Sequence, residues 1–445
     1  MLSETDSLYL LYLKFKFMRR KIKVVWTITC VLVAFIFNLD SLNAANKAKV
    51  GKSIPAWKEG YLDIHFINTG TGESSFIIMP DGTQLLVDMA GAVLTPEEDP
   101  MWIKPMPDDS RRPGEWINRY VARCMKWTKN EKIDYVSITH THGDHMGNCP
   151  ERLPKSPKGN WQAMSVTDVL DGNKVGKLVD RAYPDYTYPR DMNDNLPVSN
   201  YLKCARWHVA TGSMKMERFL PGSDTQFAML YDGDSYPEFK IRNIAANGQV
   251  WTGKGLETKC AFPDQSAFEG RGKGKEPSPA ENILSSVFKL SYGKFDYYAG
   301  GDASHNGAEY FDWKDVETPI ADAVGCVEVM KANHHGSKDA NNDYILRTLS
   351  PQTVIINVWR NVQPTGGIRK YLGPEVNGGK TDLFMTNLLP EVEESFGDDM
   401  SRVLSKQGHI VVRVAPGGDS YSIIVLRDSD ESMKVTGVFG PYYCR

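Results

Sequence analysis

Long apolar runs, cysteine pairs and histidine are all scarce in this chain of 445 residues. The longest apolar run, Val24–Phe37, has 14 residues, fewer than the ~20 that a membrane-spanning helix needs. The seven cysteines show no Cys-x-x-Cys spacing, so neither a disulfide framework nor a cysteine-pair zinc site is indicated. No Gly-x-Ser-x-Gly elbow and no complete Gly-Lys phosphate loop occurs, so neither a serine nucleophile nor a nucleotide cradle is indicated.

The charge balance argues against nucleic acid as a partner. The formal net charge is −3, with hydrophobic residues at 41%, which is ordinary for a globular protein with a sizeable core. Residues 1–44 carry six basic and three acidic residues, so the rest of the chain has a formal net charge of −6. An acidic chain lacks the positive surface by which non-specific nucleic-acid binders attract phosphate.

The first 44 residues are typical of a signal peptide. Arg19–Lys23 is a basic cluster, Val24–Phe37 is apolar, and Leu42–Ala44 ends in a small residue suited to cleavage. We therefore expect export to the periplasm or outside the cell, with no membrane span after cleavage and a single domain over residues 45–445. An uncleaved membrane anchor is the alternative.

Histidine is rare overall but concentrated in one place. Of nine histidines, three fall within six positions, at His140, His142 and His145, with Asp144 among them. They follow Tyr135–Ile138, whose apolar character predicts a buried strand, and α/β sheets place their sites at such strand ends. Two histidines two positions apart can chelate one ion, while Asp144 and His145 can turn toward a second. Zinc, iron and manganese suit these ligands, and clustering favours a metal site over a merely polar loop.

The pattern His140-x-His142-x-Asp144-His145 resembles the signature of the metallo-β-lactamase superfamily. Two further segments, His65–Asp88 and Lys331–Ser337, resemble its ComEC-like branch, which is related to the hydrolase domain of a DNA-uptake protein. A third segment, Phe295–Asp302, resembles the strand that carries the superfamily's bridging aspartate. The resemblance implies an α/β fold, an αββα four-layer sandwich with long insertions at about 91–131 and 150–280. It also implies two divalent metal ions, with zinc first and manganese or iron as alternatives.

The same resemblance implies roles for single residues. Asp302 would bridge the two ions, and one of His334 and His335 would bind the second ion. The pairing of His335 with Gly336 favours His335 slightly, which leaves His334 for a substrate oxygen or a supporting hydrogen bond. Asp88 would support the metal loop by hydrogen bonding without being a ligand.

The first ion lacks an obvious third histidine. The superfamily usually takes one from the region between the motifs, and His208 is the only histidine between positions 145 and 302. His208 is therefore the candidate, against a packed or surface histidine beside Trp207. ComEC-like members often lack this ligand, which leaves an incomplete first site as the alternative.

The implied activity is that of a metal-dependent hydrolase that uses a metal-bound hydroxide, with Asp144 both ligating and orienting it. A phosphodiester is the leading substrate, because the ComEC-like branch includes nucleases and a related esterase acts on cell-envelope polymers. The acidic chain and expected export favour a small-molecule or envelope substrate over DNA. Val362–Pro364 stands where relatives commonly carry Gly-His-Pro, which also counts against a nuclease. A β-lactamase or lactonase and a catalytically degenerate binding protein on this fold are the alternatives.

Local patterns also predict individual elements. Apolar runs and turn signals predict strands at Tyr61–Asn68, Ser75–Met79 and Gln84–Asp88. The apolar spacing of residues 114–128 predicts a helix with a packing face. A further helix or two is expected near residues 167–180.

Overall fold

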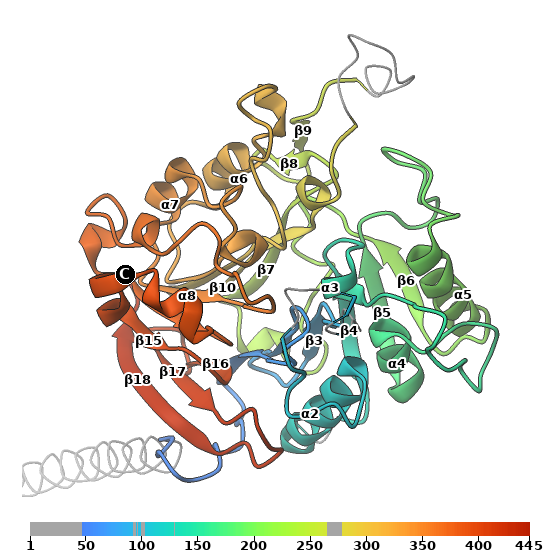
Figure 1. Ribbon diagram of the computed structural model, residues 1–445, viewed down its shortest axis with the longest axis horizontal. Coiled ribbons are helices and arrows are strands. Elements are labelled where there is room, and N and C mark those ends of the chain that lie inside the picture. Colours follow the sequence, from blue (N-terminus) through green and yellow to red (C-terminus); the bar gives the residue numbers. More distant parts are fainter. Residues whose placement is uncertain (1–46, 92–94, 96, 99–102, 129, 265–277) are drawn as a thin grey trace, which may run out of the picture. The chain divides into compact units, whose positions relative to one another are not determined.

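Two nine-stranded sheets organise the computed structural model, which describes residues 47–91, 95, 97–98, 103–128, 130–264 and 278–445 (Figure 1). Lys49–Arg445 form one compact unit. The expected signal peptide lies outside the described residues. Within the described part of the chain, no helix has both the length and the apolar character needed to cross a bilayer.

The first sheet is antiparallel at one side and parallel at the other. Its parallel part begins where β3 pairs with β4 and continues through β6. Its spatial order is β18 (Val435–Tyr443), β17 (Ser420–Leu426), β16 (His409–Val414), β1 (Leu62–Phe66), β2 (Ser75–Ile78), β3 (Gln84–Val87), β4 (Ile133–Ile138), β5 (Val175–Asp180) and β6 (Lys215–Arg218).

The second sheet has the same division. Its parallel part runs from β11 to β15. Its spatial order is β15 (Val403–Ser405), β14 (Asp382–Met385), β13 (Thr353–Ile356), β12 (Val329–Lys331), β11 (Phe295–Ala299), β10 (Val287–Tyr292), β7 (Phe239–Ala246), β8 (Gln249–Trp251) and β9 (Thr258–Cys260).

Helices cover the outer face of each sheet. The described helices are α2 (Pro113–Thr128), α3 (Gly143–Met146), α4 (Ser165–Gly172), α5 (Leu196–Ala210), α6 (Glu317–Val324), α7 (Asp343–Leu349) and α8 (Pro390–Glu394), together with short 3-10 turns such as η5 (Asn333–Gly336). In β1, Ile64 joins a buried cluster that also holds Val329 of β12, so this cluster lies between the sheets. Because strand side chains alternate between the two faces of a sheet, the neighbouring His65 points to the other face. There its Nδ1 lies 3.0 Å from the hydroxyl oxygen of Tyr120 on α2.

The second sheet follows the same rule. Met330 of β12 turns away from the first sheet and packs with Ile320 of α6 and Leu346 of α7. The order helix, sheet, sheet, helix confirms the expected αββα sandwich. The strands expected near residues 61–88 and the helix near residues 114–128 are also present.

A helix or two was expected near residues 167–180, and this is wrong for residues 173–180, which are not helical. The helix α4 ends at Gly172, and Asn173 is already extended, with φ −130° and ψ 158°. The following segment is strand β5, which pairs in parallel with β4. Val175 and Val179 suit a strand, and pairing with a buried neighbour decides the conformation.

Candidate metal centre

The expected metal motifs meet where parallel strands of both sheets end. Asp88 follows β3, and His140 follows β4 in the first sheet. Asp302 follows β11, and His335 follows β12 in the second. Parallel strands bring their carboxyl ends to one edge, so four segments distant in sequence converge.

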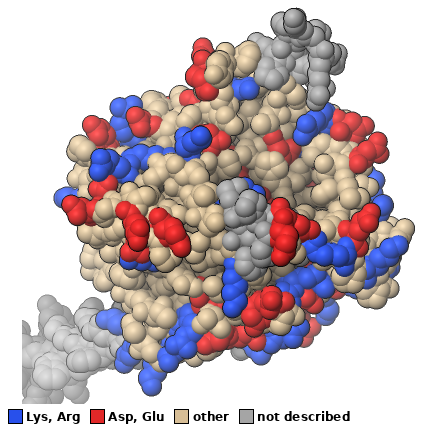
Figure 2. All heavy atoms as spheres, in the orientation of Figure 1, with Lys and Arg blue, Asp and Glu red and all other residues tan. Residues whose placement is uncertain are grey.

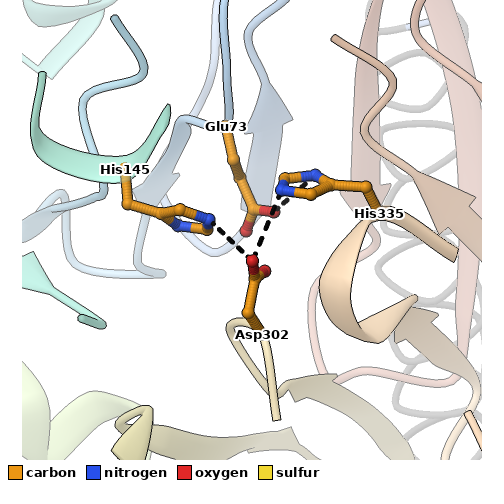
Figure 3. Close-up of side chains that lie close together, drawn as sticks. All are labelled: Glu73, His145, Asp302 and His335. Atoms are coloured by element: carbon orange, nitrogen blue, oxygen red, sulfur yellow. Dashed lines mark ion pairs between the residues drawn. The ribbon is translucent and has the colours of Figure 1, made fainter. Parts of the chain in front are cut away.

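Asp302 lies at the middle of this convergence. Its Oδ2 lies 3.3 Å from Nε2 of His145, 3.6 Å from Nε2 of His335 and 3.8 Å from Nε2 of His140. Nε2 of His334 lies 3.9 Å away. Figure 3 shows Asp302 between His145 and His335, with Glu73 beside them. One carboxylate oxygen thus faces four imidazoles, an arrangement suited to a cation shared among them.

The donor atoms fall into two overlapping groups. His140, His142 and Asp302 place one ligand atom each within 4.8 Å of one another, and Nε2 of His140 lies 3.1 Å from Nδ1 of His142. His145, Asp302 and His335 form the second group with Glu73. Among the described residues, buried His145 Nε2 and Asp302 Oδ1 make no hydrogen bond, which fits atoms reserved for a metal ion.

Hydrogen bonds behind the histidines fix their orientation. Nδ1 of His145 lies 2.8 Å from Asp88 Oδ2, and Asp88 also accepts bonds from the Thr139 amide and hydroxyl. Nδ1 of His335 lies 3.0 Å from the carbonyl oxygen of Asn357. In the neutral ring, such contacts hold the proton on Nδ1 and direct the Nε2 lone pair forward. Asp88 thus hydrogen-bonds to the loop and to one histidine from behind, and its supporting role stays a prediction.

Sequence reasoning missed Glu73 and Lys331. Buried Lys331 Nζ lies 2.6 Å from Glu73 Oε2, 3.8 Å from Asp302 Oδ1, and donates to the Gly301 carbonyl at 2.6 Å. Glu73 Oε2 also lies 3.7 Å from His335 Nδ1. A lysine inside a short buried strand and an acid after Gly70-Thr-Gly72 were the available signals, because both are costly to bury without a partner.

The loop carrying Glu73 approaches the metal loop closely. The Glu73 amide donates to the Asp144 carbonyl at 2.9 Å. A Cβ on Gly72, whose φ is +145°, would lie 2.2 Å from that same oxygen. Only glycine permits this approach, so Gly72 fixes Glu73 beside the centre.

The pKa values of the site's groups are shifted by burial and by one another. Burial, aided by the neighbouring His145, lowers the pKa of His140 well below its usual value. Burial acts in the same direction on His145, but Asp302 and Asp144 outweigh it and raise its pKa well above the usual value. Burial would raise the pKa of Asp302, but His145 and His335 bring it well below its usual range. The carboxylate is therefore ionised at neutral pH and attracts cations.

Backbone strain is concentrated at the same place. Asp88, His334 and His335 have positive φ angles of 56°, 45° and 53°. Such conformations cost of order 1 kcal/mol or more for residues other than glycine and persist where surrounding structure enforces them. Three strained residues at one candidate centre indicate that their side-chain directions matter more than local stability.

His208 is not brought to this centre. It lies on α5, where its Nε2 is 2.9 Å from Asp171 Oδ1 of α4. The expectation that it completes the first ligand group therefore disagrees with the geometry. Its helix packs on α4, which turns the imidazole toward that helix.

The loop between His140 and His142 is instead secured by an acid. Glu281 accepts bonds from the Thr141 amide at 2.9 Å and its hydroxyl at 2.7 Å. The buried guanidinium of Arg181 holds Glu281 through two bonds of 2.7 and 2.6 Å. This pair is a further feature that local sequence patterns did not reveal.

We expect the Asp88→Asn substitution to weaken metal binding by about 10- to 100-fold, the usual cost of losing a supporting partner. An amide has only one accepting oxygen and no charge, so it cannot accept from the Thr139 amide on one side and from His145 on the other, and the hold on the His145 ring weakens. Metal retained after dialysis against graded chelator concentrations measures the change. Asp81→Asn, in the turn between β2 and β3, is the matched control. Equal retention by wild type and Asp88→Asn would contradict the supporting role.

The fold and these side chains define an α/β sandwich with a candidate metal-binding site. No protein-family profile matches the chain, and no curated protein matches it. Thirty-five chains of solved structures match in shape. One, from Parabacteroides distasonis, is described as a "Putative metal-dependent hydrolase". It has a TM-score of 0.32 and 15% identity, and the match covers 75% of this chain and 98% of that one.

Proposed function

We propose that this chain is a metal-dependent hydrolase of the metallo-β-lactamase type that cleaves a phosphodiester or related ester. One observation carries the proposal: four imidazole Nε2 atoms lie within 3.9 Å of Oδ2 of Asp302. The donor set of imidazoles and carboxylates suits zinc, with manganese and iron as alternatives.

Two groups of residues would hold two divalent ions. His140, His142 and Asp302 would hold one ion, and His145, His335 and Asp302 the other. Cations bound here would lower the pKa of a water molecule and polarise the scissile bond's oxygen. Asp88 and the Asn357 carbonyl keep the histidines directed at the ions.

Exposure separates the roles of the remaining side chains. The side chain of Asp144 is 12% exposed whereas that of Asp302 is 1% exposed, so Asp144 is the acid that water can reach. It would accept a hydrogen bond from the attacking water and orient it. His334 is 25% exposed and His335 only 1%. We therefore assign His335 to the ion and His334 to a substrate oxygen, with Asp339 holding His334 Nδ1 at 2.9 Å.

A small-molecule or cell-envelope phosphodiester is the proposed substrate. Figure 2 shows basic and acidic side chains mixed on the face drawn, and the chain after residue 44 has a formal net charge of −6. Neither feature favours a polyanion such as DNA. The basic and apolar composition of residues 19–44 supports export to the periplasm or the exterior.

Substrate preference is tested with the full chain loaded in turn with zinc, manganese and iron. We expect kcat/KM for a bis-aryl phosphodiester to exceed that for a chromogenic β-lactam or a lactone by more than ~10-fold. Chelator should abolish turnover and added metal should restore it. Metal content measured on the same samples ties turnover to bound ions.

The other outcomes identify the alternatives. Faster β-lactam or lactone turnover would replace the phosphodiesterase assignment with the rival hydrolase. Less than one ion per chain together with no turnover would instead indicate a binding protein on a degenerate hydrolase fold.

A further inference from the structure

A second group of metal-binding residue types lies on two helices of the first sheet's outer layer. Asp171 is near the end of α4, and Cys204 and His208 lie on α5, which packs against it (Figure 1). Cys204 and His208 are four positions apart and therefore share one helix face. The group has no residue in common with the centre around Asp302.

Hydrogen bonding leaves Nε2 of His208 facing a carboxylate. The Ser213 hydroxyl donates to the His208 carbonyl at 3.0 Å, and Nδ1 of His208 lies 3.0 Å from the same hydroxyl oxygen. When that hydroxyl donates to the carbonyl, Nδ1 donates to the hydroxyl oxygen. In the neutral ring Nε2 then carries the lone pair, although it lies only 2.9 Å from Asp171 Oδ1. In this tautomer a cation would bring the two acceptors together, whereas in the other tautomer Nε2 donates to Asp171 and Nδ1 accepts from Ser213.

The carboxylate of Asp171 is held in a matching orientation. Its Oδ2 accepts bonds from the Trp161 indole at 3.0 Å and the Ser156 hydroxyl at 2.7 Å. Oδ1 is thus directed at His208 and at the sulfur of Cys204, which lies 3.8 Å away. Lys158 lies 3.9 Å from Oδ1, but its hydrogen bond goes to the Asp171 backbone carbonyl at 2.6 Å. Outer partners that fix ligands as they fix Asp171 and His208 are characteristic of metal sites.

We propose that Asp171, Cys204 and His208 bind a divalent transition-metal ion of the zinc class that links α4 to α5. Their ligand atoms lie within 4.8 Å of one another. Bonds of ~2.0–2.3 Å in a tetrahedron put ligand atoms about 3.3–3.8 Å apart, so the 2.9 Å between His208 Nε2 and Asp171 Oδ1 would have to widen slightly when an ion binds. A sulfur ligand favours zinc or cobalt over magnesium or calcium. The side chain of Asp171 is 18% exposed, which leaves solvent access for a fourth ligand.

Cobalt tests the proposal through its own optical signature. The centre around Asp302 contains no cysteine, so a cobalt–thiolate charge-transfer band reports the α4–α5 group. Chelator-stripped full-length protein should develop this band on Co²⁺ titration and saturate at one thiolate-bound ion per chain. Asp302→Asn should leave the band intact, and Cys204→Ser should abolish it. His208→Asn should weaken cobalt binding at this site by at least ~10-fold.

Cys124→Ser is the matched control, since Cys124 is a buried free cysteine of α2 and its loss should not change the band. Absence of the band in wild type, or its persistence in Cys204→Ser, would overturn the proposal and leave a hydrogen bond between His208 and Asp171. Circular dichroism establishes whether each variant folds. If Cys204→Ser does not fold, undiminished cobalt affinity in His208→Asn would overturn the proposal by itself.

Discussion

Asp302→Asn is expected to lower kcat/KM for the phosphodiester by more than ~100-fold and to reduce metal bound at the candidate centre. A loss of this size exceeds the cost of removing a partner outside the ligand shell. The physical reason is that one Asp302 oxygen faces four imidazoles at 3.3 to 3.9 Å. An amide carries no negative charge to offset the positive charge of a bound metal ion. Steady-state kinetics and metal analysis of the same preparation measure both effects.

Asp296→Asn is the matched control, because Asp296 lies on the same strand and bonds to Ser291 and Lys289 instead. It should keep wild-type turnover and metal content. Full activity in Asp302→Asn would refute the proposed mechanism. Lost activity with unchanged metal content would move Asp302 from ligand to a purely electrostatic role.

Arg413→Met is expected to lower the free energy of unfolding at pH 7 by about 3–5 kcal/mol, the usual cost of leaving one member of a buried ion pair alone. Arg413 of β16 lies opposite Asp63 of β1 in the sheet. Two hydrogen bonds of 2.8 and 2.6 Å join the pair, and the side chains are 5% and 0% exposed. Denaturant unfolding of the wild type and of Arg413→Met at pH 7 measures the difference in their free energies of unfolding.

This ion pair also sets an acid dependence. Burial would raise the pKa of Asp63, but Arg413 outweighs it and lowers the pKa from 3.8 to about 2. The folded state therefore gains stability from the Asp63 carboxylate above pH 3.8, and this gain is lost as pH falls through about 2. The stability difference between wild type and Arg413→Met should be largest near neutral pH and shrink toward pH 2.

Two further variants distinguish burial from charge. Arg119→Met removes a partner of Glu431 in a more exposed ion pair and should cost less than about 1 kcal/mol. Asp63→Leu combined with Arg413→Met should recover much of the loss, because no buried charge remains unpaired. A double variant less stable than Arg413→Met would show that the pair's hydrogen bonds, and not the isolated charge, account for the effect.

Several features of the centre were predictable because their signals are local. The apolar run Tyr135–Ile138 followed by three histidines predicted a buried strand ending in a metal loop, and β4 is that strand. Phe295–Ala299, with Gly300 and Gly301 after it, likewise predicted the strand that presents Asp302. Strand period and turn residues act over a few positions, so a single sequence records them.

Other features depended on which segments become neighbours. Nothing near Glu73 in the sequence indicates Lys331. Glu73 lies in the loop between β1 and β2 of the first sheet, Lys331 ends β12 of the second sheet, and the two meet only after folding. His208 was expected at the Asp302 centre because it is the only histidine between positions 145 and 302. The rarity of histidine along the chain says nothing about the direction in which α5 packs, and the structure places His208 beside Asp171.

The sequence by itself determined the residue types at the ends of the strands and the histidine-rich loop, and its resemblance to a known superfamily implied the αββα layers. Only the tertiary structure decided that Glu73, Lys331 and Glu281 support this loop, and that His208 faces Asp171. The physical reason is that apolar periodicity depends on residues close together in the sequence, whereas the partners of buried charges depend on how distant elements pack.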